Sequence, residues 1–314
     1  MILGSGAVGG YFGAKLAQSG EKVSFIARGE HLSAMQKHGL KIESIKADFS
    51  VNPVIAVGSG EPITDVDVVI VAVKSYQLAE AIDSILPMIS AKTRIIPLLN
   101  GVNAIEQLTD LGVNKAQIIG GIAKIISAIK SPGVISHLGT EPHLTFGFHS
   151  SSENHIKSPD EFNNLETIVT KFKQADVSIA ISRDIQIALW RKFIFVAAWG
   201  ALASIDNKTV GQLRTGAMRA NLEQIVTEYA NIAQANKVNI THHMVQETLK
   251  FIDLLPEHST TSMQRDIAQI ISGEKTECEF DVLVAYPYSL AKKHHVACPQ
   301  LSYCYENVAK RLVK

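Results

Sequence analysis

The feature that most constrains this chain is a glycine-rich loop that begins three residues from its start. The loop matches G-x-G-x-x-G with Gly4, Ser5, Gly6, Ala7, Val8 and Gly9. Apolar residues precede it, a helical pattern follows at 8–19, and a strand-like apolar run comes next at 22–27. In this context the motif predicts a parallel βαβ unit whose loop amides hold a pyrophosphate at the helix N-terminus. A glycine-rich turn that binds nothing is the alternative interpretation.

Further apolar runs extend this unit into a sheet. Residues 66–73 and 94–99 are continuously apolar, which is typical of strands covered on both faces, and a helical pattern at 76–88 separates them. This order predicts a Rossmann-type, doubly wound parallel sheet. Turn residues crowd the segment 133–148, which we interpret as antiparallel strands that finish the sheet edge. Because a core strand usually has about 5–6 residues, we expect the chain to begin part-way into its first strand.

The pattern changes after Ser182, where strand-like runs give way to helical ones. Helical periodicity covers residues 183–204, 218–236, 242–254, 280–295 and 299–313. A chain of 314 residues is long enough for about two domains. We therefore predict an NADP-binding Rossmann-type α/β domain at 1–182 and an all-helical substrate and catalytic domain at 183–314. An apolar helix face in such a domain is often buried against a second copy, so a homodimer is compatible with the sequence.

Composition excludes several classes of protein. Thirty basic and thirty acidic residues cancel, so we expect no binding to nucleic acid or to an anionic membrane surface. The longest apolar stretch, Phe193–Ala203, is shorter than the roughly 20 residues of a membrane span, and the N-terminus lacks a signal-peptide pattern. The adjacent histidine pairs lack metal-site spacing, so no metal is expected. Reduced thiols in the cytoplasm best explain the odd number of cysteines, which are Cys278, Cys298 and Cys304.

The residue after the second predicted strand indicates which dinucleotide binds. An acidic residue there would hold the ribose hydroxyls of NAD, but the chain has Arg28 and no acid until Glu30. A guanidinium suits a 2′-phosphate through paired, charge-assisted hydrogen bonds. We therefore predict NADP as the cofactor, with a solvated surface arginine as the alternative.

Several separated segments, taken in order, resemble the ketopantoate reductase (2-dehydropantoate 2-reductase) family. Besides the glycine loop, they are Val71–Lys74, Leu98–Gly101, Pro132–Val134, Trp190–Phe193, Thr261–Met263 with Asp266, and Gly273–Glu277. The resemblance implies an NADPH-binding Rossmann domain, a helical domain, and reduction of a 2-keto acid to a 2-hydroxy acid. It also implies that Lys192 is the general acid, that Asn100 lies between nicotinamide and substrate, and that Glu277 binds cofactor and orients the site. By the same resemblance, Ser262 contacts the substrate, while Ser127 and Lys74 lie near the cofactor.

The chemistry supports the role of Lys192 independently. Hydride transfer to a ketone builds negative charge on its oxygen, which a proton-donating cation offsets. A partly buried lysine gives up a proton more readily than an arginine, and Lys192 directly precedes the apolar stretch Phe193–Ala203. A charge at such an edge is either functional or snorkels to solvent. Purely structural roles are the alternatives for three residues: an Asn-Gly turn for Asn100, an exposed acid at a helix start for Glu277, and a helix N-cap for Ser262.

The chain departs from the family on the lysine's own helix face. Family members carry asparagines four and eight residues after the lysine, where this chain has Val196 and Gly200. Valine cannot hydrogen-bond a substrate, so we expect a more apolar pocket, a lowered Lys192 pKa and altered specificity. Gly200 is expected to free volume for a larger substrate group.

Three functions remain open from the residues. The first is an NADPH-dependent reductase acting on ketopantoate by default, or on a more hydrophobic 2-keto acid. The second is a β-hydroxyacid dehydrogenase, which would normally carry an asparagine where Val196 stands. The third is a non-catalytic NADPH-sensing protein, against which the joint presence of Lys192, Asn100 and Glu277 argues.

Overall fold

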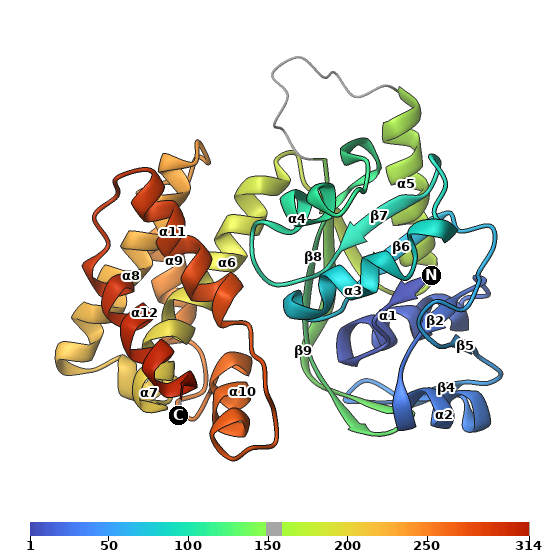
Figure 1. Cartoon of the computed structure of the whole chain (residues 1–314), viewed down its shortest axis with the longest axis horizontal. Helices are drawn as coiled ribbons and strands as arrows, with labels where there is room; N and C mark the ends of the chain where they lie inside the picture. The colour runs from blue at the N-terminus through green and yellow to red at the C-terminus, as the bar shows by residue number, and fades with distance from the viewer. Residues whose placement is uncertain (149–158, 314) are drawn as a thin grey trace. The chain divides into compact units, whose positions relative to one another are not determined.

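The computed structural model describes residues 1–148 and 159–313, with side chains from residue 164 onward in the second range, and it divides into two compact units (Figure 1). Unit 1 comprises Met1–Leu99 and Asn103–Ile185; unit 2 comprises Asn100–Val102 and Gln186–Lys314. The main change of unit falls close to the predicted boundary at Ser182. The assignment of Asn100–Val102 to unit 2 was not predicted.

Sheet A of unit 1 is parallel, and its strand order is β5-β2-β1-β6-β7. Counted along the chain, these five strands have the order 3-2-1-4-5, which is that of a Rossmann fold. Ile2 of β1 lies between Phe25 and Ile70 of its neighbours, and all three side chains are buried. The predicted Rossmann-type sheet is therefore confirmed. The strands are β1 (Ile2–Leu3), β2 (Ser24–Ile26), β5 (Ile55–Val57), β6 (Val68–Val71) and β7 (Arg94–Pro97).

Helices cover sheet A unequally on its two faces. Phe12 of α1 and Ile135 of β9 share one core with the side chains of Phe25 and Ile70. The opposite face packs against α3 and α4. The predicted helix at 76–88 is interrupted, with α3 at its centre and a 3₁₀ turn on each side. The helices of unit 1 are α1 (Ala7–Gln18), α2 (Gly29–His38), α3 (Leu78–Asp83), α4 (Ala104–Asp110) and α5 (Pro159–Gln174), with 3₁₀ turns η1 (Ser75–Gln77), η2 (Leu86–Met88) and η3 (Lys115–Gln117).

A second sheet corrects the prediction for residues 133–148. These residues form one long strand, β9, which pairs antiparallel with β8 in sheet B and is not the edge of sheet A. Gly139 and Thr140, two of the turn residues in this segment, lie where the β8–β9 pairing shifts register, so they mark a bulge inside the strand. Sheet B has the order β10-β9-β3-β4, with β8 on β9; its strands are β3 (Leu40–Ser44), β4 (Phe49–Val51), β8 (Gly120–Ser131), β9 (Val134–Gly147) and β10 (Ser178–Ile181).

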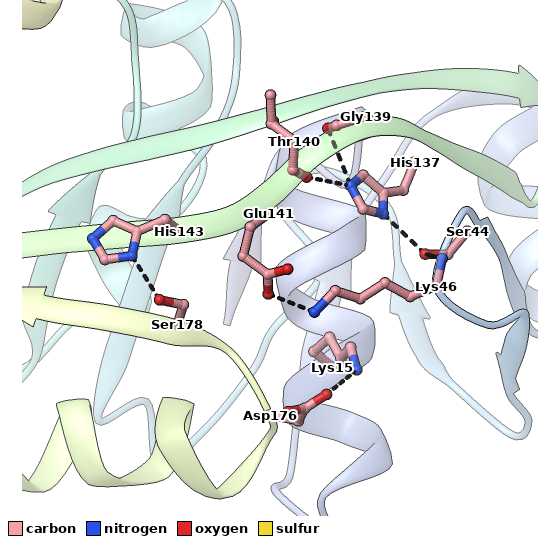
Figure 2. Close-up of polar contacts among 10 residues, drawn as sticks. All are labelled: Lys15, Ser44, Lys46, His137, Gly139, Thr140, Glu141, His143, Asp176 and Ser178. Atoms are coloured by element: carbon pink, nitrogen blue, oxygen red, sulfur yellow. Dashed lines mark hydrogen bonds and ion pairs between the residues drawn. The ribbon is translucent and has the colours of Figure 1, made fainter.

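Buried His137 holds this bulge in place (Figure 2). Its Nε2 lies 2.8 Å from the Thr140 carbonyl and 3.2 Å from that of Gly139. Carbonyls only accept, so Nε2 carries the proton, and Nδ1 accepts from the Ser44 hydroxyl at 2.9 Å. Figure 2 also shows the pairs Lys46–Glu141, Lys15–Asp176 and His143–Ser178. The contacts of His137 and Lys46 tie the end of β3 and the turn after it to β9, which is a structural role.

Unit 2 is helical in the part that the structure describes, which confirms the predicted helical domain. Its central helix α6 buries Phe193, Ile194 and Ala197 among the other helices. By length and composition α6 could cross a membrane, but over half of its most apolar window is buried, as in the core helix of a soluble protein. The elements are α6 (Ile185–Asp206), α7 (Val210–Leu213), α8 (Gly216–Ala235), α9 (His242–Asp253), α10 (Ser262–Ile271), the π-helix η4 (Asp281–Ala285), α11 (Tyr286–Lys293) and α12 (Pro299–Leu312).

Candidate active site

Lys192 stands on α6, directly before the buried Phe193. Its side chain is half-buried, and burial lowers its pKa from 10.5 to about 8, against the opposing effect of the Glu279 carboxylate. Burial penalises the charged form of a lysine, while a nearby negative charge favours it. Here burial has the larger effect. The direction agrees with the one expected from the apolar sequence around Lys192.

Glu279 and Asn100 complete a polar group in unit 2. Glu279 is only 2% exposed, and its Oε2 accepts a hydrogen bond from Asn100 Nδ2 at 3.1 Å. Asn100 comes shortly after β7, and Gly101 follows it with a φ of 102°, a backbone conformation that favours glycine. Because a carboxylate can only accept, this contact orients the Asn100 amide. An ammonium, a buried carboxylate and an oriented amide are therefore held by one unit.

The carboxylate of this group is not the one predicted. Glu277 is exposed, whereas Glu279, two residues further on, is buried and contacts Asn100. A signal for Glu279 was present in the sequence, because it opens the apolar run of Phe280 and Val282–Ala285. Lys192 was selected by that same criterion, a charge at the edge of an apolar stretch.

The α6 face beyond Lys192 also differs from expectation. A Cβ atom at Gly200 would lie 3.3 Å from Cγ2 of Thr261, so the expectation that Gly200 frees volume for substrate is wrong. The methyl group of Thr261 already occupies that space. Val196, between Lys192 and Gly200 on this face, is half-buried.

Thr261, and not Ser262, caps the N-terminus of α10. Its hydroxyl accepts from Gln264 N at 3.1 Å, and its own amide donates to Gln264 Oε1 at 2.8 Å, which is a capping box. The N-cap of α10 is therefore Thr261, and Ser262 is the first helical residue. The alternative interpretation of Ser262 as a cap is wrong, and its half-buried side chain does not serve α10 as an N-cap.

Glycine is needed for two different reasons in the glycine loop of unit 1. A Cβ at Gly4, where φ is 94°, would lie 2.7 Å from Val73, and one at Gly9 would lie 2.2 Å from the Gly4 carbonyl oxygen. The chain's own packing therefore requires these two. Gly6 N-caps α1, has an ordinary φ of −73°, and has no described atom within 4 Å of where its Cβ would be. Close approach of a ligand to the backbone would explain glycine at Gly6.

Ser5 and His31 fasten this loop to its surroundings. The Ser5 amide and hydroxyl both donate to the Ile26 carbonyl, at 3.1 and 2.9 Å. The first amides of α1, including those of Ala7 and Val8, point toward the helix N-terminus, as in any α-helix. His31 Nδ1 accepts from Gly133 N at 3.1 Å, so Nε2 carries the proton and donates to the Ser5 carbonyl at 2.9 Å. Burial lowers the His31 pKa. His31 was not predicted, and no motif marks it.

The other predicted cofactor residues also lie in unit 1. Arg28 N-caps α2 and forms an exposed ion pair with Glu80, with Arg28 Nη1 at 3.2 and 3.3 Å from the two carboxylate oxygens. Lys74 is half-buried and follows the end of β6. The hydroxyl oxygen of Ser127, on β8, is buried and has no hydrogen-bond partner among the described residues. Such atoms are rare in folded proteins, and a bound ligand is one explanation.

Comparison with known proteins matches both units to one family. The model "Ketopantoate reductase PanE/ApbA" matches residues 1–151, and its C-terminal counterpart matches 184–311. An uncharacterised oxidoreductase of Bacillus subtilis, YkpB, is 29% identical over 98% of this chain and 97% of its own. The crystal structure of 2-dehydropantoate 2-reductase from Geobacter metallireducens is 26% identical, with a TM-score of 0.85 and 98% of each chain covered. D-mandelate dehydrogenase, solved with NADH and anilino(oxo)acetate, shares the fold at 22% identity and a TM-score of 0.84, covering 99% and 97% of the chains. The protein belongs to the ketopantoate reductase PanE/ApbA family of oxidoreductases.

Proposed function

We propose that this protein reduces a 2-keto acid to a 2-hydroxy acid with NADPH, with Lys192 as the general acid and ketopantoate as the default substrate. The observation that carries the proposal is the half-buried Lys192 with a pKa lowered to about 8, beside the buried Glu279 that orients Asn100. A general acid works best when its pKa lies near the operating pH. Lys192 meets that condition, whereas a solvated lysine does not.

Lys192 acts on the carbonyl oxygen of the substrate. As hydride adds to the carbonyl carbon, negative charge grows on that oxygen, and the ammonium stabilises it and then gives it a proton. At neutral pH a group with a pKa of about 8 is mostly protonated, so Lys192 carries the proton that it donates. Its lowered pKa also makes the proton easier to release than that of an exposed lysine.

Glu279 supports this proton transfer in two ways, through its charge and through its contact with Asn100. The Glu279 charge raises the Lys192 pKa and so offsets part of the burial effect, which keeps the lysine protonated at neutral pH. Its carboxylate also holds Asn100 Nδ2, which directs the amide oxygen the other way. We assign to Glu279 the orienting role that the family resemblance had placed on Glu277.

The residues of unit 1 fit a dinucleotide. The open position at Gly6, the first amides of α1 and the Ser127 hydroxyl, which has no partner among the described residues, suit a bound cofactor, which when present supplies the hydride. Arg28 would hold the 2′-phosphate of NADPH. Its ion pair with Glu80 is exposed, and such pairs contribute about 0–1 kcal/mol, so a phosphate can replace the carboxylate. D-mandelate dehydrogenase was solved with NADH, so both cofactors must be compared.

A more hydrophobic 2-keto acid is the alternative substrate. Val196 favours it, since valine replaces a hydrogen-bonding residue on the lysine's helix face. The shared fold with D-mandelate dehydrogenase, named for an aromatic 2-hydroxy acid, agrees with this direction. Gly200 no longer supports it, because Thr261 occupies the adjacent space. We also propose a cytoplasmic location, in line with three free cysteines.

The test is NADPH oxidation with ketopantoate beside smaller and bulkier 2-keto acids, repeated with NADH. Lys192→Ala should abolish turnover, whereas Lys250→Ala, which removes an exposed lysine of α9, should not. Lysine-dependent turnover that prefers ketopantoate supports the default substrate, and preference for another keto acid makes Val196 a specificity residue. NADPH binding without turnover on any keto acid would overturn the enzymatic proposal in favour of a sensor.

A further inference from the structure

The chain directly after Glu279 is an irregular helix. It begins as the π-helix η4 and continues as α11, with Pro287 near the start of α11. In an α-helix the amide of residue 287 would donate to the carbonyl of Leu283. Proline has no N–H, so Pro287 cannot supply the α-helical donor to the carbonyl of Leu283, a residue that is only 1% exposed. A buried carbonyl in this position needs another partner.

Tyr229 of α8 supplies that partner. Its hydroxyl donates to the Leu283 carbonyl at 2.8 Å, and its side chain is 0% exposed. The Leu283 amide in turn donates to the backbone carbonyl of Glu279 at 3.0 Å. Separate hydrogen bonds therefore join Tyr229 to Leu283, Leu283 to the backbone of Glu279, and the Glu279 carboxylate to Asn100, and the covalent bonds within Leu283 and Glu279 connect them.

The ring of Tyr229 reaches the other half of the site. It packs on Phe193 with ring centroids 5.7 Å apart, and Phe193 is the residue next to Lys192 on α6. One fully buried side chain thus contacts both the helix that carries Lys192 and the turn that follows Glu279. These segments are distant in sequence, and all of them belong to unit 2.

The hydroxyl of Tyr229 stays a donor over the working pH range. Burial raises its pKa well above 10, and the titratable groups that face it, Glu228, Cys298 and Cys304, act in the same direction. The Glu228 carboxylate is itself held by the amides of Gln300 and Leu301 at the start of α12. The Tyr229 contact with Leu283 is therefore permanent rather than a switch.

We propose that Tyr229 is a positioning residue of the active site, which sets the placement of Glu279 relative to Lys192 through the Leu283 carbonyl, to which Pro287 cannot donate. It acts through these residues and contacts neither the substrate nor the cofactor. Its catalytic consequence rests on the proposed function. Its effect on the ionisation of Lys192 does not.

The test uses Tyr229→Phe, which removes one oxygen and keeps the ring on Phe193. We expect kcat to fall about tenfold, as small displacements of catalytic groups do, with KM for NADPH unchanged. Because Glu279 raises the Lys192 pKa, its displacement should also move the fall of kcat/KM to lower pH. Tyr303→Phe, which changes an exposed tyrosine of α12, is the matched control and should alter neither quantity.

Pro287→Ala provides the rescue. The alanine amide can donate to the Leu283 carbonyl, so the double variant Tyr229→Phe/Pro287→Ala should recover most of the lost kcat and the original pH profile. The proposal is overturned if Tyr229→Phe keeps the kcat and pH profile of the unmodified protein. It is equally overturned if the loss persists in the double variant.

A readout without substrate separates this proposal from the proposed function. The rate of Lys192 acetylation by acetic anhydride, followed by mass spectrometry against pH, reports the deprotonated fraction of that lysine. Half-maximal labelling near pH 8 should move to lower pH in Tyr229→Phe and return in the double variant. Labelling that shifts in a protein without turnover would support the positioning role and refute only the enzymatic function. Labelling that does not shift would refute the positioning role whatever the activity.

Discussion

The amide of Asn100 donates a 3.1 Å hydrogen bond to the carboxylate of Glu279, although 179 positions separate the two residues in the sequence. This contact places the loop after β7 in the same unit as the helices that follow residue 185. It also fixes which side of the asparagine donates and which accepts. The polar group around Lys192 is therefore assembled from three distant segments of the chain.

The pH dependence of reduction should follow Lys192. In the proposed reaction the proton donor is the ammonium form of Lys192, and burial lowers its pKa to about 8, so kcat/KM for the keto acid should fall as pH rises through about 8. Oxidation of the 2-hydroxy acid needs the neutral amine and should rise over the same interval. Steady-state rates in both directions between pH 6 and 10 (roughly the range in which a perturbed lysine titrates) would check this. Parallel falls in both directions would assign the titration to another group.

Removing the charge of Glu279 should change the ionisation of Lys192. Glu279→Gln keeps the size of the side chain and its contact with Asn100, but the Lys192 pKa loses the raising influence of the Glu279 charge and should fall further. The high-pH limb of kcat/KM should therefore move to lower pH. Glu277→Gln, which changes an exposed acid two residues earlier, is the control and should leave the profile unchanged. The reverse result would restore the role first assigned to Glu277.

Returning the family asparagines should have different effects at two positions of α6. Gly200→Asn should destabilise unit 2 by about 1–3 kcal/mol, as overpacking does, because its Cβ would already lie 3.3 Å from Thr261. Val196→Asn, at a half-buried position, should cost less and shift preference toward polar 2-keto acids. Urea unfolding and kcat/KM ratios between ketopantoate and an aromatic 2-keto acid would measure both. Equal stability of the two variants would mean that α10 moves aside without cost.

Cofactor choice should depend on Arg28 and its exposed partner. Arg28→Ala should raise KM for NADPH about ten- to hundredfold, since hydrogen bonds to charged groups contribute about 1.5–3 kcal/mol, and should leave KM for NADH nearly unchanged. Glu80→Gln removes the carboxylate that competes for Arg28 and should lower KM for NADPH slightly. Similar changes for both cofactors in Arg28→Ala would show that this arginine is only a surface residue.

Unit 1 should become less stable in mild acid, because the folded protein holds His31 in its neutral form. Burial lowers its folded pKa below 6.5, so its stabilising contribution is complete above about pH 6.5 and is lost as pH falls through the folded value. Protonation of Nδ1 would remove the acceptor used by Gly133. His31→Gln offers a donor and an acceptor without titrating, so its unfolding midpoint should depend less on pH than that of the unmodified protein between pH 7.5 and 5 (roughly a unit on either side of a histidine pKa). Identical slopes for the two proteins would exclude His31 as the sensitive group.

Much of unit 1 was predictable because its signals are local. The glycine loop, the continuous apolar runs of β6 and β7 and the helical pattern of α1 each depend on residues close together in the sequence. Sheet B was misread because Gly139 and Thr140 look like a turn. Whether such residues end a strand or bulge within it depends on the partner strand β8, which no local pattern reveals.

The candidate site shows the same division. Lys192 and Asn100 could be selected from the sequence, because a charge beside an apolar stretch and a polar residue at a strand end are local features. The choice between Glu277 and Glu279 depended on where burial begins, and the space beside Gly200 depended on the N-cap of α10, about sixty positions further along the chain. The sequence by itself determined the fold class and the glycine loop, and it singled out Lys192 as the candidate acid. Only the tertiary structure decided which carboxylate stands beside Lys192, because side-chain burial and contact are properties of packed helices rather than of neighbouring residues.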